Sequence, residues 1–207
     1  MISLKEILGD HAPILIIDSG SARIQVGMID RAGARWEESE EEAGVGIFRC
    51  VESLAVDLGE IRGFAFAEGP GSVLGIRTAA MALRTWCAIA PRPVFAYHGL
   101  SLLAQADGRA GVGFIADARR DSWHCCRLGE AVRRVPTAEL QPPLAMPGEF
   151  RHWSALPPGV ERVPYKLAEL LARVADAPLF HATDAPDAFL HQEPQYAAWA
   201  PQIHRAP

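Results

Sequence analysis

The order of strand-like and helix-like patterns in the first half of the chain constrains its fold most. Residues 14–17 are all apolar, which predicts a buried strand, and apolar residues alternate over 24–28, which predicts a second strand. The elements predicted next are strands at 34–38, 61–68 and 92–97 and helices at 43–58, 73–90 and 99–106. A hairpin followed by two helix–strand units predicts a mixed sheet with helices packed on it.

A new series of strand-like segments begins after Gly108. Two further strands are predicted around a turn at Arg119 and Arg120, over 111–118 and 121–128. Twelve of the sixteen prolines then fall at or after Pro136, where one clear helix is predicted. We therefore expect an α/β protein with mixed sheets flanked by helices, in two lobes. The second lobe is small, proline-rich and loop-rich. The predicted boundaries are 1–108 and 109–207.

A glycine-rich loop, "EGPGSVLG", separates a predicted strand from the helix at 73–90. Neither the Walker spacing G-x-x-x-x-G-K-[ST] nor the dinucleotide spacing G-x-G-x-x-G matches it. Pro70 fixes φ, Gly71 tolerates a positive φ, and Ser72 can cap the helix. A structural turn is the favoured interpretation, while free amides at the helix start leave an anion contact open.

The helices predicted at 43–58 and 73–90 carry more apolar surface than one sheet can cover. Each has a stripe at helical spacing for the core and further apolar residues elsewhere on its circumference. Excess apolar surface of this kind usually marks a protein interface. The alternative is that both helices are buried within the monomer.

Composition limits the classes of function. The chain is 49% apolar and 22% charged, with a net charge of −5 and a pI of about 5.8. This balance is typical of a soluble globular protein and argues against a nucleic-acid binder that acts alone. The four cysteines form no CxxC pair, so we expect free thiols in a reducing cytosol, and no signal peptide or membrane-spanning stretch is found. A cytoplasmic protein is predicted.

Four segments resemble the TsaB (YeaZ) family: "ILIIDSGSARIQVGMID", "FAFAEGPGSVLGIRTAAMALRTW", "PVFAYHGLSLLA" and "IADARRDSWHC". The loop GPGS-x-x-G-x-R is the most specific match, "DARRD" is a second, and "EPQY" at 193–196 is a faint third. The resemblance implies a two-lobed actin-like ATPase (ASKHA, ribonuclease H-like) fold. It also implies a non-catalytic subunit that pairs with TsaD for threonylcarbamoyladenosine modification of tRNA.

The same resemblance implies the partners. A TsaD-like catalytic subunit docks on the two helices of the first lobe, a TsaE-like ATPase joins the assembly, and tRNA is contacted only indirectly. A homodimer through the same helices is also implied. A specific interface of this kind would bury on the order of 1,600 Å² in total. The expected interface residues are Val45, Ile47, Phe48, Val51, Leu54, Val73, Leu74, Arg77, Met81 and Arg84. No catalytic, cofactor or metal residues are expected.

Two alternatives stay open. Val73 and Leu74 stand where the family has Phe-Thr, which leaves room for a divergent homodimer of unassigned role. The other alternative is an actin-like nucleotide-binding enzyme. Its expected residues are Asp18, Ser19, Ser21, Gly69 and Gly71.

The second lobe offers less to such an enzyme. The turn that would supply its second phosphate hairpin is Asp117-Ala118-Arg119-Arg120, which contains no glycine. The two arginines could still meet an anion there, although a solvated turn is the simpler interpretation. No histidine pair has the spacing of H-E-x-x-H, so a zinc site is not expected.

Overall fold

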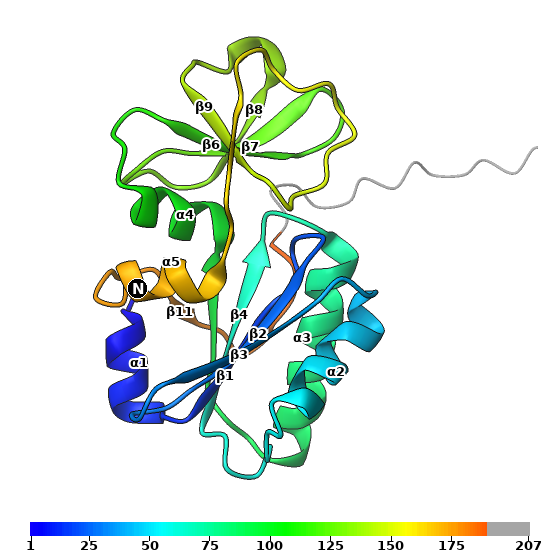
Figure 1. Cartoon of the computed structure of the whole chain (residues 1–207), viewed down its shortest axis with the longest axis vertical. Helices are drawn as coiled ribbons and strands as arrows, with labels where there is room; N and C mark the ends of the chain where they lie inside the picture. Colours follow the sequence, from blue (N-terminus) through cyan, green and yellow to red (C-terminus); the bar gives the residue numbers. More distant parts are fainter. Residues whose placement is uncertain (190–207) are drawn as a thin grey trace, which may run out of the picture.

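The computed structural model describes residues 1–189. Their strands form two sheets, one above the other in Figure 1, with helices beside and between them. The first sheet has the order β11-β5-β4-β1-β2-β3, and the second has the order β10-β9-β6-β7-β8. Both sheets mix parallel and antiparallel pairs, as the α/β prediction requires.

The first sheet begins with the predicted hairpin and continues with parallel strands. Its strands are β1 (Ile14–Asp18), β2 (Ile24–Ile29), β3 (Ala34–Ser39), β4 (Gly63–Gly69), β5 (Val94–His98) and β11 (His181–Ala182). β1 pairs antiparallel with β2 and parallel with β4. β1 is therefore central and buried along its whole length, which explains why its sequence is apolar without alternation.

The second sheet is built around the predicted pair of strands at the turn of Arg119 and Arg120. Its strands are β6 (Gly113–Asp117), β7 (Ser122–Cys126), β8 (Arg133–Pro136), β9 (Leu144–Pro147) and β10 (Glu161–Val163). The short β9 and β10 lie in the proline-rich region, where the sequence predicted loops, and the short β8 ends at the first proline of that region. Their pairing with β6 and β7 supplies an order that local pattern does not reveal.

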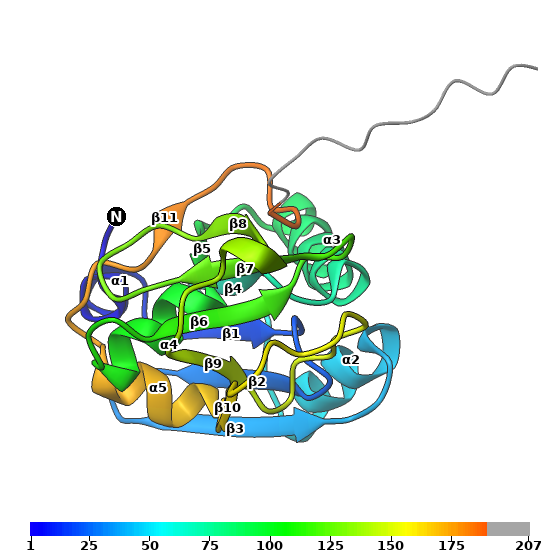
Figure 2. The same ribbon diagram turned by 90° about the horizontal axis from the view of Figure 1, so that it is seen from above.

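The helices lie on both sides of the first sheet. They are α1 (Leu4–His11), α2 (Ala43–Ser53), α3 (Val73–Ile89), α4 (Gly99–Asp107) and α5 (Leu167–Arg173), with a 3₁₀ turn at Thr137–Glu139. In both ribbon views α2 and α3 lie together on one side of the molecule, and α1 and α5 lie on the opposite side (Figures 1 and 2). No helix among residues 1–189 is long and apolar enough to cross a membrane.

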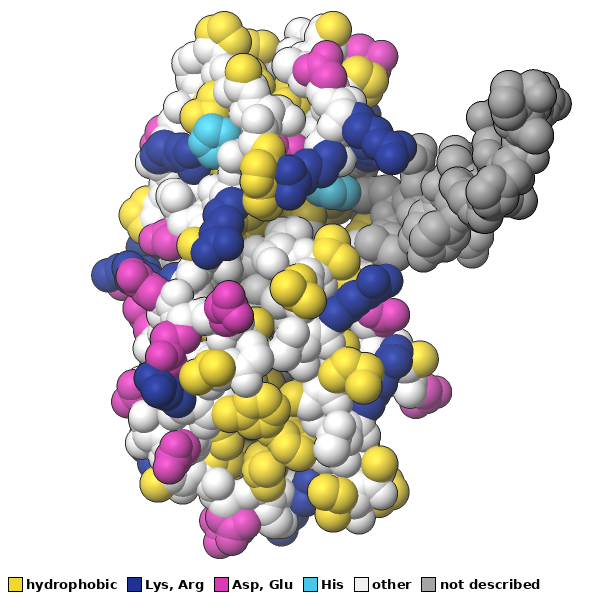
Figure 3. All heavy atoms as spheres, turned by 90° about the vertical axis from the view of Figure 1, so that its right-hand side faces the viewer, with side chains coloured by type: hydrophobic (Ala, Val, Ile, Leu, Met, Phe, Trp, Pro, Cys, Tyr) yellow, Lys and Arg dark blue, Asp and Glu magenta, His cyan; other side chains and the backbone are white. Residues whose placement is uncertain are grey.

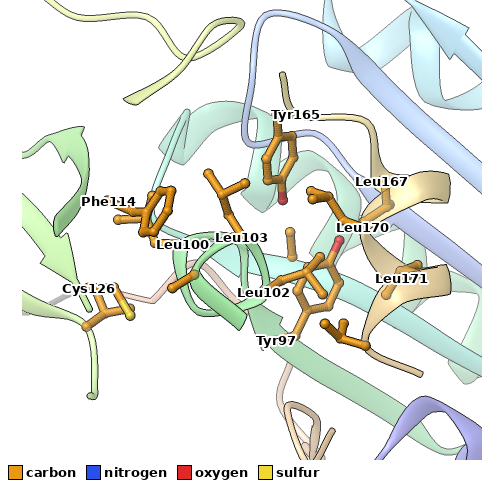
Figure 4. Packing of buried hydrophobic residues seen from close by; sticks show 14 of the residues in the cluster. Tyr97, Leu100, Leu102, Leu103, Phe114, Cys126, Tyr165, Leu167, Leu170 and Leu171 are labelled. Atoms are coloured by element: carbon orange, nitrogen blue, oxygen red, sulfur yellow. The ribbon is translucent and has the colours of Figure 1, made fainter. Parts of the chain in front are cut away.

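Helix α4 joins the two layers. Its residues Leu100 and Leu103 lie in one core cluster with Phe114 of the second sheet and with Leu170 of α5 (Figure 4). The same cluster contains Ile14 and further residues of the first sheet. One continuous core therefore runs through both layers.

Two helices differ from the prediction. α2 ends at Ser53 rather than residue 58, because Ala55 adopts a left-handed conformation with φ 49° that an α-helix does not allow. α1 was not predicted. It begins at a capping box, in which Ser3 accepts a hydrogen bond from the Glu6 amide and Glu6 accepts one from the Ser3 amide.

The predicted division at residue 108 stays a prediction, but the strand order adds one fact. β11, from the region assigned to the second lobe, pairs with β5 in the first sheet. The chain therefore returns to the first layer after completing the second. The faint family match at 193–196 lies outside the described residues.

Candidate functional site

The exposed apolar residues of α2 and α3 form the first candidate site. They are Val45, Phe48, Val73, Leu74, Met81 and Ile89, and we call them the α2–α3 surface. Leu74 is 79% exposed, Met81 is 56% exposed and Ile89 is 81% exposed. Figure 3 shows yellow side chains gathered on the lower half of the face that carries these helices. Large apolar side chains grouped in this way are typical of an interface rather than of free surface.

The exposed side of α3 has the spacing of a helix-packing seam. Leu74, Thr78, Met81, Thr85 and Ala88 follow one another at intervals of four and three residues. The Thr78 hydroxyl donates to the Leu74 carbonyl at 2.9 Å, and the Thr85 hydroxyl donates to the Met81 carbonyl at 2.8 Å. Both threonines have thus satisfied their hydroxyl donors within the helix, so the seam can pack against an apolar partner without leaving these donors unpaired.

Three of the predicted interface residues are not on this surface. Ile47, Val51 and Leu54 are buried in the core cluster between α2, α3 and the first sheet. The prediction that they contact a partner is corrected, because α2 turns this stripe inward and presents Val45 and Phe48 outward. Phe48 stays beside the core, with its ring edge-on to Trp86 of α3 at 6.2 Å between centroids.

Arg77 and Arg84 lie on α3 as predicted, and both are exposed. The Arg77 Nε lies 3.3 Å from Asp187 Oδ1, and Arg84 Nη2 lies 3.9 Å from Asp187 Oδ2. One carboxylate therefore fixes the orientation of both guanidinium groups. These half-exposed ion pairs add little stability, but they hold the two charges at one edge of the α2–α3 surface.

Ile89 belongs to the α2–α3 surface although the sequence analysis did not select it. It is the last residue of α3 and lies eight positions after Met81, which keeps it on the same side of the helix. The spacing of apolar residues along α3 could therefore have identified Ile89 from the sequence.

The glycine loop brings two turns of the backbone into contact. A Cβ on Gly71 would lie 2.3 Å from the Gly20 carbonyl oxygen, and a Cβ on Gly75 would lie 2.2 Å from the Ser19 carbonyl oxygen. The Ser72 amide donates to the Gly20 carbonyl, and the Ser72 hydroxyl caps α3 by accepting from the Gly75 amide at 3.2 Å. The predicted cap is confirmed, and the glycines serve the close approach of the two turns.

Asp18 lies beneath this contact and is only 1% exposed. Its carboxylate accepts hydrogen bonds from the Tyr165 hydroxyl at 2.7 Å, the Gly20 amide at 3.0 Å and the Tyr97 hydroxyl at 3.1 Å. Figure 4 shows the hydroxyl groups of these two tyrosines pointing into the same region from opposite sides. Burial raises the pKa of Asp18 above its ordinary value, and these three hydrogen bonds reduce the rise.

The serines expected in a phosphate loop are also engaged inside the protein. The Ser19 hydroxyl donates to the Gly75 carbonyl at 2.9 Å, and the Ser21 hydroxyl donates to the Arg23 carbonyl at 2.5 Å. The Ser19 bond ties the turn after β1 to α3, and the Ser21 bond lies within that turn. Among residues 1–189, no group of three or more His, Cys, Asp or Glu side chains has the arrangement of a metal site.

A cleft between the two layers is the second candidate site. Its volume is about 580 Å³, and we call it the interlobe cleft. One wall is formed by the turn at Gly20 and Ser21 and by the start of α3, and the other wall by the β6–β7 turn, β8 and the segment around Trp153. The turn at Arg119 and Arg120 therefore faces the glycine loop across a space of ligand size.

Comparison with known proteins gives the fold. No protein-family model matches the chain, and no curated protein matches it significantly. Solved structures do match. YeaZ from Pseudomonas aeruginosa is similar with a TM-score of 0.58 and 21% identity, over 78% of this chain and 89% of that chain.

A second solved structure agrees. It is described as an uncharacterized protein with similarity to peptidase YeaZ from Pseudomonas aeruginosa, with a TM-score of 0.56 and 20% identity, over 77% of this chain and 88% of that chain. The predicted resemblance to TsaB (YeaZ) is thus confirmed at the level of the fold. The chain has the fold of YeaZ, with two mixed sheets flanked by helices.

Proposed function

We propose that this chain is a non-catalytic subunit of the TsaB (YeaZ) kind. In this proposal it pairs with a TsaD-like catalytic subunit for threonylcarbamoyladenosine modification of tRNA in the cytoplasm. A TsaE-like ATPase joins the assembly, and tRNA is contacted only indirectly. The observation that carries the proposal is the α2–α3 surface, where six large apolar side chains from two adjacent helices are exposed.

The fold likeness supports this proposal. It covers 78% of this chain and 89% of YeaZ from Pseudomonas aeruginosa. The seam on α3 adds a physical reason, since its four-and-three spacing suits packing against another helix. Arg77 and Arg84, oriented by Asp187, would set the register of that packing.

The state of the turn after β1 supports a non-catalytic role. An actin-like enzyme would hold phosphate at this turn through hydrogen-bond donors that the protein itself leaves unengaged. Here the Asp18 carboxylate is enclosed by two tyrosines, and the Ser19 and Ser21 hydroxyls donate to backbone carbonyls. This favours a scaffold over the nucleotide-hydrolysing alternative.

The proposal is tested with a purified TsaD-like subunit from the same organism. The measurement is the molar mass of the mixture by size-exclusion chromatography with light scattering, and the affinity by calorimetry. We expect Leu74→Glu and Met81→Glu each to weaken pairing by at least about tenfold, because burying an apolar side chain of this size contributes about 1.5–3 kcal/mol. Leu156→Glu is the matched control, since Leu156 is an exposed leucine outside the α2–α3 surface.

Two outcomes would contradict the proposal. The first is pairing with unchanged affinity in both glutamate variants. The second is a homodimer of this chain that the TsaD-like subunit does not dissociate, which would favour the divergent homodimer.

A further inference from the structure

The α2–α3 surface combines exposed apolar side chains with charges that are already paired. Leu74 and Ile89 are its most exposed members, at 79% and 81%. The two arginines on α3, Arg77 and Arg84, both lie beside the Asp187 carboxylate, which carries the opposite charge. Contact between large apolar side chains and water is unfavourable, so a surface of this kind is expected to be covered. A covering segment would have to be apolar and nearly uncharged.

The last described residues lie at the edge of this surface. Ala188 follows Asp187 directly, is only 8% exposed, and lies in the core cluster that α3 shares with the first sheet. The Phe189 amide donates to the Glu68 carbonyl of β4 at 2.7 Å. Figures 1 and 2 show this segment, in orange, passing close to the start of α3. The next residues of the chain therefore begin beside the exposed Leu74.

The sequence that continues from this point has the composition that the surface requires. Residues 190–207 lie outside the described residues and read "LHQEPQYAAWAPQIHRAP". Only two of these 18 residues carry a full charge at pH 7, Glu193 and Arg205, and their charges are opposite. Tyr196 and Trp199 supply large aromatic side chains. Segments that remain in water are usually rich in charge and poor in aromatic residues, so this composition favours contact with an apolar surface.

Length and attachment both allow this segment to reach the surface. From Val73 to Ile89, α3 extends about 24 Å at about 1.5 Å per residue. Trp199 comes ten residues after Phe189, and an extended chain of that length spans up to about 33 Å. Attachment to the same chain also gives the segment an effective concentration on the order of millimolar. A second copy of the chain at micromolar concentration is at a disadvantage against it.

We propose that residues 190–207 cover the α2–α3 surface of the isolated chain and leave it when a partner binds. Trp199 lies over the apolar side of α3 at Met81, and Asp187 anchors the start of the segment to Arg77 and Arg84. The partner then meets a bare surface in only a fraction of the molecules, and its apparent affinity falls by that fraction. The covering does not depend on which partner binds, while the competition rests on the proposed pairing.

The covering is tested on the full chain by NMR of ¹³C-labelled methionine methyl groups. Met81 is 56% exposed on the α2–α3 surface, whereas Met146 is fully buried in the second sheet. An aromatic ring shifts the signal of a methyl group that it contacts. We therefore expect Trp199→Ala to move the Met81 signal and to leave the Met146 signal in place, at every protein concentration. The Met81 signal is identified by its loss in Met81→Leu.

Trp153→Ala is the matched control, because Trp153 is an exposed tryptophan on the other layer of the molecule. It should leave the Met81 signal unchanged. The competition is measured by calorimetry with the TsaD-like subunit. Covering in roughly nine molecules out of ten would make Trp199→Ala pair about tenfold more tightly than the unaltered chain, with no such gain in Trp153→Ala.

Three results would overturn the covering. They are a Met81 signal that Trp199→Ala does not move, an equal movement in Trp153→Ala, and a movement that depends on protein concentration, which would assign the surface to a second copy of the chain. Unchanged pairing affinity in Trp199→Ala would overturn the competition. If the TsaD-like subunit binds none of these chains, the proposed function fails, while the methyl signals still decide the covering.

Discussion

Asp18 shows how single residues position the site. Its buried carboxylate joins the turn after β1 to Tyr97 of β5 and to Tyr165, which precedes α5. Burial and the neighbouring carboxylate raise the pKa of both tyrosines well above the ordinary value, so both hydroxyls remain donors at neutral pH. A short side chain thereby links both layers of the molecule beneath the interlobe cleft.

We expect Tyr165→Phe to lower the free energy of unfolding at pH 7 by about 1.5–3 kcal/mol, the usual value for a hydrogen bond to a charged group. The measurement is urea unfolding across pH. The folded-state pKa of Asp18 is raised, so the stability that Asp18 contributes falls as the pH rises through that pKa. Tyr165 limits this fall by stabilising the charged form.

The loss in Tyr165→Phe should therefore be largest above the raised pKa of Asp18 and shrink as the pH falls through it. A loss of stability in Tyr165→Phe that stays constant across this pH range would contradict the role given to the Tyr165 hydroxyl.

The residues of α2 mark the limit of sequence reasoning at this scale. Helical spacing correctly found two apolar stripes, but it could not decide which stripe faces the sheet. Ile47 and Leu54 lie inward, while Val45 and Phe48 lie outward, because α3 packs beside α2 and shares the same sheet face. Long-range packing made this choice, and a single sequence does not contain it.

Helix α3 is the element on which both candidate sites depend. Its outer side carries most of the α2–α3 surface, and its first turn forms part of the interlobe cleft. The close approach of Gly75 to the Ser19 carbonyl fixes where this first turn lies.

We expect Gly75→Ala to destabilise the protein by about 1–3 kcal/mol, because its Cβ would lie 2.2 Å from backbone that cannot move freely. Gly44→Ala in α2 is the matched control, since no atom lies within 4 Å of its Cβ position. That change should be neutral or stabilise by up to about 1 kcal/mol. The measurement is thermal unfolding of both variants. Equal stability of the two would contradict the role assigned to the close approach of Gly75 to the Ser19 carbonyl.

Most elements with strong local signals were predicted from the sequence, and the weak ones were not. β1, β2, β4, α3 and α4 have long apolar patterns or clear turn residues at their ends. β8, β9 and β10 have only three or four residues each, so partners in the sheet rather than local pattern define them. The arginines that line the interlobe cleft, namely Arg119, Arg120, Arg134 and Arg151, come from three separate segments, so only Arg119 and Arg120 were visible as a pair in the sequence.

At the scale of the whole molecule, the two layers share one core and polar ties. The core cluster contains Ile16 of the first sheet, Leu103 of α4 and Trp123 of the second sheet. Gln25 of β2, only 2% exposed, adds a polar link to the chain that returns from the second sheet. Shared burial of this kind favours unfolding of both layers in one transition.

Gln25 is the residue that tests this cooperativity most directly. Its Nε2 donates to the Tyr165 carbonyl at 3.0 Å, and its Oε1 accepts from the Leu167 amide at 2.7 Å. Gln25→Leu leaves both backbone groups buried without partners, so we expect a loss of about 2–4 kcal/mol in the free energy of unfolding. Gln105→Leu, at an exposed position of α4, should change it by less than about 0.5 kcal/mol. In urea, far-UV circular dichroism and tryptophan fluorescence should report one shared midpoint, which Gln25→Leu lowers for both signals together. If that variant instead splits the signals into two transitions, the layers unfold separately, and the core at α4 does not couple them.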